Sequence, residues 1–338
     1  MKTRYLLFLL LAVACKKHDN PPPTQPPPPA SGPFVYVGGS SNGVGVYWKT
    51  ALSQSNPVAN PVTVQGSVGI RAIAPSGSDV YMAGQTGGYW KNDTFVPVTG
   101  AASIGYLALS GATVCSLGFD NFSYAAYWEG NSEVNIGEQF PAESTREIGL
   151  VGITVSNANV YVSTTTTFAY TPGNPDTLSG NYGFLWKNDS YQILRSGVFR
   201  GVQVKTGMVI SGNDVCVAGM IPLDTAYFYG GGYWKNGVWT AISKYFEPAG
   251  IAGSGSDLYI AGNLFSPQGA VQAVCWKNGS MTSLPGGASA TAVTLYGGDV
   301  YILGVDGNND NVVWKNGVLF EKLGATSAFN AFCLAVGN

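Results

Sequence analysis

The feature of this sequence that most restricts its fold is a short phrase, Trp-Lys-Asn or a close variant, that recurs along most of the chain. Its tryptophans are Trp48, Trp90, Trp128, Trp186, Trp234, Trp276 and Trp314, with successive spacings of 42, 38, 58, 48, 42 and 38 residues. Of the eight tryptophans, only Trp239 falls outside the series. A period of this length indicates one supersecondary unit copied seven times, each copy burying a face against its neighbours.

A second phrase precedes most copies of the first and is clearest at Ser76-Gly77-Ser78-Asp79-Val80-Tyr81-Met82-Ala83-Gly84. Related segments begin at Ser110, Ser156, Ser211, Ser254 and Tyr296. Small apolar runs, such as residues 70–74 and 290–295, come before this phrase, and runs such as 95–98 and 318–323 follow the tryptophan phrase. The pattern predicts four strands, a to d, in each unit, with Asn-Gly or Asn-Asp at the c–d hairpin. The 46 glycines and 11% charged residues suit an all-β chain with many tight turns.

The two ends of the repeated region complete one unit between them. Residues 34–39 have the pattern of a strand b with no strand a before it, and residues 328–336 that of a strand a with no strand b after it. Pairing them would close a ring and remove exposed sheet edges. This arrangement resembles β-propeller proteins over residues 33–338, and the Trp-Lys-Asn-Gly wording is similar to uncharacterised repeat lipoproteins of Gram-negative bacteria. The resemblance implies an all-β, seven-bladed β-propeller of four-stranded antiparallel blades, with the N- and C-terminal strands in one blade.

The first residues have the pattern of a targeting segment. Lys2 and Arg4 precede a short apolar run at 6–13, and Ala12-Val13-Ala14-Cys15 resembles a bacterial lipobox, although Ala12 stands where that motif usually has leucine. We therefore expect a lipoprotein signal peptide at 1–14 and a lipidated Cys15, with an ordinary signal peptide as the alternative. The proline-rich residues 15–32 predict a tether, extended at about 3.1 Å per residue or else a floppy linker. The domain at 33–338 would be an outer-membrane lipoprotein on the periplasmic or cell-surface side, held to the membrane by lipid alone.

Several classes of function are excluded or disfavoured by composition. A net charge of −2 gives no basic footprint for nucleic acid. The single histidine, His18, lies in the tether, so neither a His/Cys zinc site nor histidine-activated catalysis is expected in the domain. Cys115, Cys216 and Cys275 stand where other repeats carry aromatic residues, and these cysteines and Cys333 are interpreted as small buried hydrophobes. We expect no cofactor and no metal, and a monomer.

The repeated side chains have structural interpretations. The seven tryptophans are predicted to pack blade against blade rather than form a sugar-stacking ring. The repeated aspartates are predicted to lie in the a–b turns and cap backbone amides rather than form a calcium ring; they are Asp79, Asp214, Asp257 and Asp299. The segment from Asp306 to Asp310 is interpreted as an acidic loop, because it lacks the closing glutamate of a calcium loop.

Departures from the repeat are the candidate functional positions, because binding residues tend to lie on loops held by a regular scaffold. The predicted b–c loops vary most and are rich in aromatic residues, with insertions at 164–183 and 220–232. We expect them to gather on one face and to bind a glycan or a protein partner, with mutual packing of the loops as the alternative. The candidate ligand-binding residues are Phe119, Phe122, Tyr124, Phe168, Tyr170, Tyr182, Tyr227, Phe228, Tyr229 and Phe265.

Two other function classes stay open, although no catalytic residue is assigned. A glycosidase or lyase needs only two suitably spaced carboxylates. The candidates are Asp120, Glu143, Glu147, Asp176, Asp224, Asp306 and Asp310. The third hypothesis is a structural subunit of an envelope complex.

Overall fold

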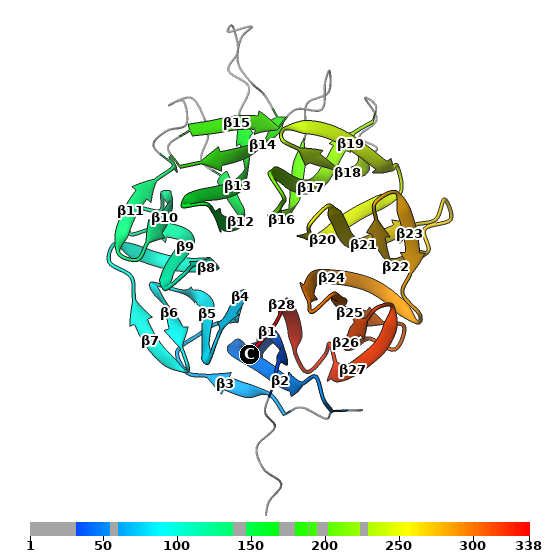
Figure 1. The fold of residues 1–338 in the computed structure, drawn as a ribbon, viewed down its shortest axis with the longest axis horizontal. Helices are drawn as coiled ribbons and strands as arrows, with labels where there is room; N and C mark the ends of the chain where they lie inside the picture. The colour runs from blue at the N-terminus through cyan, green and yellow to red at the C-terminus, as the bar shows by residue number, and fades with distance from the viewer. Residues whose placement is uncertain are drawn as a thin grey trace, which may run out of the picture. The chain divides into compact units, whose positions relative to one another are not determined.

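The chain forms seven four-stranded antiparallel blades arranged in a ring (Figure 1). The computed structural model describes residues 32–54, 60–137, 147–168, 180–188, 190–194, 202–223 and 229–338. All regular elements in these ranges are strands, which confirms the predicted fold class. The predicted signal peptide and nearly all of the predicted tether, residues 1–31, lie outside the described residues. Among the described residues, no helix is long and apolar enough to cross a membrane.

Each blade runs from an inner strand a to an outer strand d. Blade 1 contains β28 (Asn330–Gly337), β1 (Phe34–Ser41), β2 (Val44–Ala51) and β3 (Val62–Val64). Blade 2 contains β4 (Ala72–Ser76), β5 (Asp79–Thr86), β6 (Gly88–Lys91) and β7 (Thr94–Pro97). Blade 3 contains β8 (Ala101–Ser110), β9 (Thr113–Asp120), β10 (Ala125–Glu129) and β11 (Ser132–Asn135). Blade 4 contains β12 (Glu147–Ser156), β13 (Asn159–Phe168), β14 (Gly180–Lys187) and β15 (Ser190–Leu194).

The remaining three blades follow the same order. Blade 5 contains β16 (Gln203–Ser211), β17 (Asp214–Pro222), β18 (Tyr229–Lys235) and β19 (Val238–Ser243). Blade 6 contains β20 (Phe246–Ser254), β21 (Asp257–Phe265), β22 (Val271–Lys277) and β23 (Ser280–Ser283). Blade 7 contains β24 (Gly287–Tyr296), β25 (Asp299–Asp306), β26 (Asp310–Lys315) and β27 (Val318–Ala325). One pair, Thr86 with Ile104, also links blades 2 and 3.

Ring closure is carried by blade 1, as predicted. Strand β28 pairs antiparallel with β1, from Phe34 opposite Gly337 to Ser40 opposite Asn330, and β1 pairs on its other side with β2. The C-terminal segment therefore supplies the inner strand of the sheet that the N-terminal segment opens (Figure 1).

Each interface between neighbouring blades contains one tryptophan of the repeat. Trp314 of blade 7, for example, packs with Ala261 and Ala273 of blade 6. The same arrangement holds at the other six interfaces, and all seven side chains are buried. Neighbouring residues on a strand point to opposite faces of the sheet. The tryptophan therefore packs against the preceding blade, and the residue before it packs against the following blade. Tyr127, for example, lies at the interface with blade 4, while Trp128 faces blade 2. The predicted core role is confirmed.

The glycine that ends the second phrase makes room for the tryptophan. A Cβ atom added to Gly219 would lie 2.8 Å from the Trp234 ring, and one added to Gly304 would lie 2.8 Å from the Trp314 ring. Both glycines also face the backbone of their strand a so closely that a methyl group would collide with it. The two repeated phrases are therefore two parts of one packing unit.

The c–d hairpins have the predicted geometry. The turn residues Asn236 and Gly237 have φ values of 52° and 82°, and Asn316 and Gly317 have 51° and 78°. Successive positive φ values match the type I′ turn that suits the twist of a two-residue hairpin.

The repeated aspartates are the first residues of strand b, not turn residues, and they bind side chains rather than backbone amides. The Asp79 carboxylate accepts a hydrogen bond from the Asn92 amide at 2.7 Å and pairs with Lys91 at 2.8 Å. The Asn92 side chain accepts in turn from the Val80 N–H at 2.8 Å. Asp214, Asp257 and Asp299 make the same contacts in their blades. The prediction of backbone capping was wrong because the amide caps are made by the asparagines.

The four cysteines of the domain are free thiols, and each packs at a blade interface. Burial raises the pKa of Cys115, Cys216 and Cys275 to about 11. The interpretation as small buried side chains is confirmed for Cys115 and Cys216, whereas Cys275 and Cys333 are only partly buried. A thiol with so high a pKa carries no charge at neutral pH.

One acidic side chain is buried beside the ring closure. Glu321 of β27 is 3% exposed, and one of its carboxyl oxygens accepts a hydrogen bond from the Thr50 hydroxyl of β2 at 2.7 Å. Its other oxygen has no partner within the described residues. Burial raises the pKa of Glu321 from 4.5 to about 7, so the folded chain holds this carboxyl neutral in mildly acidic solution.

We predict that Glu321 makes the domain less stable as pH rises from about 4.5 to about 7. In that window the unfolded chain releases a proton that the folded chain retains, so the free energy of unfolding falls by roughly 1.4 kcal/mol per pH unit from this group. Urea denaturation at several pH values should show a flatter profile for Glu321→Gln than for the parent. Parallel profiles for the two proteins would contradict the assignment.

We also predict that Trp314→Ala lowers the free energy of unfolding by about 3–5 kcal/mol, because it opens a large cavity in a closed interface. Trp239, which lies outside the repeat and is only half-buried, supplies the matched control. Denaturant titration of Trp239→Ala should give a clearly smaller loss. Equal losses would mean that the repeated position is not special.

Candidate functional site

The strand directions give the ring two distinct faces. Because strand b runs antiparallel to its strands a and c, the a–b and c–d turns lie at one end of each blade and the b–c connections at the other. We call these the turn face and the loop face. The candidate residues at the ends of strand b belong to the loop face, as predicted.

The b–c loop of blade 3 is organised by one buried carboxylate. One oxygen of Asp120, which is 4% exposed, accepts hydrogen bonds from the N–H groups of Phe122 and Tyr124, each at 2.8 Å. The Asp120 N–H donates to the Tyr124 carbonyl at 2.9 Å, and the Asn121 N–H donates to Gly100 at 3.1 Å. These bonds hold residues 121–124 in one conformation.

This loop presents aromatic side chains beside a hollow. Phe122 is 81% exposed and Tyr124 is 46% exposed, and they line a hollow of about 370 Å³ together with Phe119 and Ile148. We call Phe119, Phe122 and Tyr124 the blade 3 platform. Sequence analysis had placed all three in the candidate site, and the structure brings them together.

The other candidate aromatics are distributed over three blades. Tyr182 and Tyr229 lie within β14 and β18, and Phe168 and Phe265 end β13 and β21, so both predicted insertions are partly strand. Phe265 lines a separate hollow of about 450 Å³ between blades 6 and 7. Tyr182 packs against the core between blades 3 and 4. Tyr170, Tyr227, Phe228 and the side chain of Phe168 lie outside the described residues.

The structure describes three of the seven candidate carboxylates. Asp120 organises its loop, and Asp306 does the same in blade 7, accepting from the N–H groups of Asn308 at 2.9 Å and Asp310 at 3.0 Å. Glu143, Asp176, Asp224 and the side chain of Glu147 lie outside the described residues.

Asp306 and Asp310 both form ion pairs with one lysine side chain. Lys322 lies 2.6 Å from the Asp306 carboxylate and 3.2 Å from that of Asp310. Burial raises the pKa of Asp306, but hydrogen bonds from Lys322 and the loop N–H groups outweigh it and hold that pKa below its ordinary value. An acid held in its ionised form does not serve as a proton donor near neutral pH. Among the described residues, no cluster of three or more metal-ligating side chains is found.

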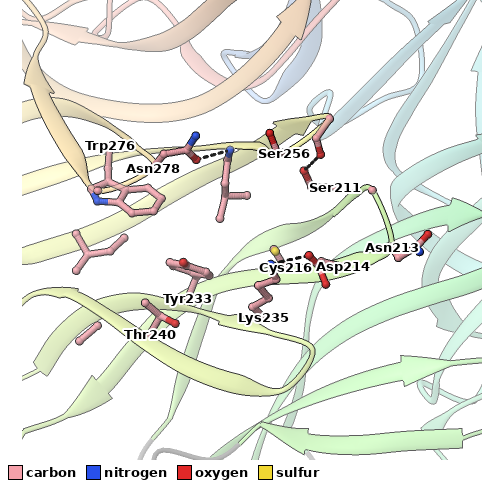
Figure 2. A pocket seen from close by; sticks show the side chains of 16 residues that line it. Ser211, Asn213, Asp214, Cys216, Tyr233, Lys235, Thr240, Ser256, Trp276 and Asn278 are labelled. Carbon is pink, nitrogen blue, oxygen red and sulfur yellow. Dashed lines mark hydrogen bonds and ion pairs between the residues drawn. The ribbon is translucent and has the colours of Figure 1, made fainter.

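A groove on the turn face, between blades 5 and 6, has a volume of about 730 Å³ (Figure 2). One wall comes from β17 and β18, including Cys216, Tyr233 and Lys235, and the other includes Trp276 of β22. The rings of Tyr233 and Trp276 lie 5.5 Å apart between centroids, inclined at 47°. Turn residues Asn213, Ser256 and Asn278 border the groove. The sequence did not predict this groove: Cys216 stands in the tyrosine position of the repeat, but so does Cys115 of blade 3.

Comparisons with known proteins assign no family to this chain. No family model matches the chain, and no curated protein matches it. Among solved structures, it is similar to the β-propeller domain of the Trilobed protease from Pyrococcus furiosus, with 12% identity, 86% of this chain and 98% of that one covered, and a TM-score of 0.49. It is similar to the computationally designed Ika8 protein, at 15% identity and a TM-score of 0.45. That match covers 85% of this chain and 83% of the other. It is also similar to a quinoprotein alcohol dehydrogenase-like protein from Bacteroides thetaiotaomicron, at 12% identity and a TM-score of 0.44. That match covers 90% of this chain and 78% of the other.

Proposed function

We propose that this protein is an envelope-anchored binding module that recognises a glycan through aromatic side chains on its loop face. The observation that carries the proposal is the blade 3 platform, in which Phe122 is 81% exposed on a loop held by the buried Asp120 carboxylate. An apolar side chain kept in water by an ordered loop forgoes the stabilisation of burial, so a role in binding is the physical reason to keep it there.

The preorganised loop supports binding in a second way. A ligand that meets side chains already held in place does not have to order them, so less of the contact energy is lost on association. The hollow beside Phe122 offers both apolar rings and the Tyr124 hydroxyl, a combination that suits the alternating C–H and O–H groups of a sugar.

A binding role is also favoured over catalysis. The candidate carboxylates with described side chains are engaged in loop hydrogen bonds or in ion pairs with Lys322. A glycosidase needs one carboxyl group with a raised pKa to protonate the leaving group, whereas the pKa of Asp306 is lowered. We therefore propose that the protein is not an enzyme.

A glycan array probed with the labelled protein tests the proposed function. We expect binding to at least one glycan, and a loss of tenfold or more in affinity for Phe122→Ala, because that ring supplies the most exposed apolar contact of the platform. Phe95→Ala is the matched control, since Phe95 is 44% exposed on the outer strand β7 and packs against Trp90. A blank array, or unchanged binding by Phe122→Ala, would defeat the proposal and would leave a protein partner to be sought by crosslinking.

We further propose that lipid on Cys15 holds the module at the outer membrane. The support is the lipobox-like segment Ala12-Val13-Ala14-Cys15 after a basic start and an apolar run. Cells fed radiolabelled palmitate should label the parent but not Cys15→Ala, and the variant should leave the membrane fraction. Membrane association of the unlabelled variant would show that another device anchors the chain.

A further inference from the structure

We propose that the groove between blades 5 and 6 is a second binding site, which takes an uncharged mono- or disaccharide. This site is distinct from the blade 3 platform, because it lies on the turn face and the platform lies on the loop face. The proposal depends on the shape of the groove, on its free polar groups and on its balance of charge.

The groove lies where blade 5 departs from the repeat at Cys216; blade 3 also carries a cysteine there, Cys115, but opposite Glu129 rather than a lysine. Five other blades carry tyrosine at this position of strand b: Tyr36, Tyr81, Tyr161, Tyr259 and Tyr301. In those blades the lysine of strand c lies 4.8 to 5.7 Å from the centre of the tyrosine ring. Cys216 stands opposite Lys235 in the same register, so a thiol replaces a phenol ring beneath the lysine.

On strand d, the facing blade 6 also lacks an aromatic ring opposite the tryptophan, as blades 3 and 7 do. Strand d sets an aromatic ring against the tryptophan in three blades, with Phe95, Tyr191 and Trp239 at 5.1, 4.8 and 4.5 Å between centroids. In blade 6 the residue opposite Trp276 is Met281. Trp276 is 8% exposed, the largest value among the seven repeated tryptophans. Neither Cys216 nor Met281 supplies an aromatic ring at this interface, and the rings of Tyr233 and Trp276 line the groove (Figure 2).

The groove offers polar groups that the fold does not use. Within the described part of the chain, the side chains of Asn213, Thr240 and Ser256 make no hydrogen bond, and all three residues are exposed. Hydroxyl and amide groups can both donate and accept, which matches the hydroxyl groups of a sugar. Aromatic rings beside such groups provide apolar contact for the C–H faces of the same ligand.

The charges lining the groove cancel. Lys235 and Asp214 form an ion pair at 2.6 Å, and Asp214 also accepts a hydrogen bond from Asn236 at 2.7 Å. These partners lower the pKa of Asp214, and Asp214 raises that of Lys235, so both groups stay charged near neutral pH. Because the pair is already matched, the groove has no net charge with which to attract an anion or a cation. The volume of about 730 Å³ falls within the range of small-molecule sites, which are roughly 300–1,000 Å³.

Isothermal titration calorimetry with four neutral disaccharides tests the proposal: maltose, cellobiose, lactose and N,N′-diacetylchitobiose. We expect at least one to bind the full chain with a millimolar or lower dissociation constant, and glucuronic acid and glucosamine to bind more weakly. Cys216→Tyr restores the residue of the repeat and fills the groove, so it should weaken binding at least tenfold. Cys216→Ala, the matched control, keeps the space open and should bind like the parent.

Two further variants complete the test. Asn213→Ala changes an exposed turn residue, so it should weaken binding several-fold without altering the melting temperature, whether or not Cys216→Tyr folds. Phe122→Ala should bind these sugars like the parent, which separates the groove from the blade 3 platform. The proposal is overturned if none of the four disaccharides binds, if a folded Cys216→Tyr binds as well as the parent, or if Asn213→Ala has no effect.

Discussion

The packing of one tryptophan from each blade into the preceding blade is the contact on which the rest of the structure depends. Each of the seven interfaces contains one such ring, and glycines such as Gly219 and Gly304 leave the space for it. A blade alone could not bury these rings, so its stability comes from its neighbours and from the closure of the circle by β28. Loops at the ends of the strands are then free to vary without loss of the core.

The two proposed binding surfaces depart from the common repeat in different ways. On the loop face, Asp120 and Asp306 each end a strand b, and each carboxylate accepts hydrogen bonds from N–H groups of the loop that follows it. In blade 3 that loop exposes the Phe122 side chain to solvent. On the turn face, the Asp-Lys-Asn contacts continue through blade 5, but Cys216 leaves space beneath them. One scaffold thus supports two chemically different surfaces.

The fold was readable from the sequence because each blade repeats the same physical problem. The periodic tryptophans, the Asn-Gly turns and the unmatched strands at the two ends together specified the ring, and the structure confirms each of them. The candidate sites could be predicted from the sequence only in part. The aromatic residues of blade 3 were identified as exceptions to the repeat, but Asp120 was considered for its acid chemistry, whereas its role depends on backbone N–H groups that no sequence pattern displays. The groove could not be predicted, because its walls come from two blades and Cys216 and Trp276 lie far apart in sequence.

The position of β1 has a mechanical consequence. This strand is hydrogen-bonded on both sides, to β28 and to β2, along nearly its whole length. Tension applied ahead of Phe34 along the axis of β1 would therefore load two ladders of bonds at once, in shear, instead of peeling a strand from a free edge. A module pulled through its N-terminal end would resist as a whole blade, and the force needed to extract that strand would exceed the force needed to unzip an outer strand such as β3.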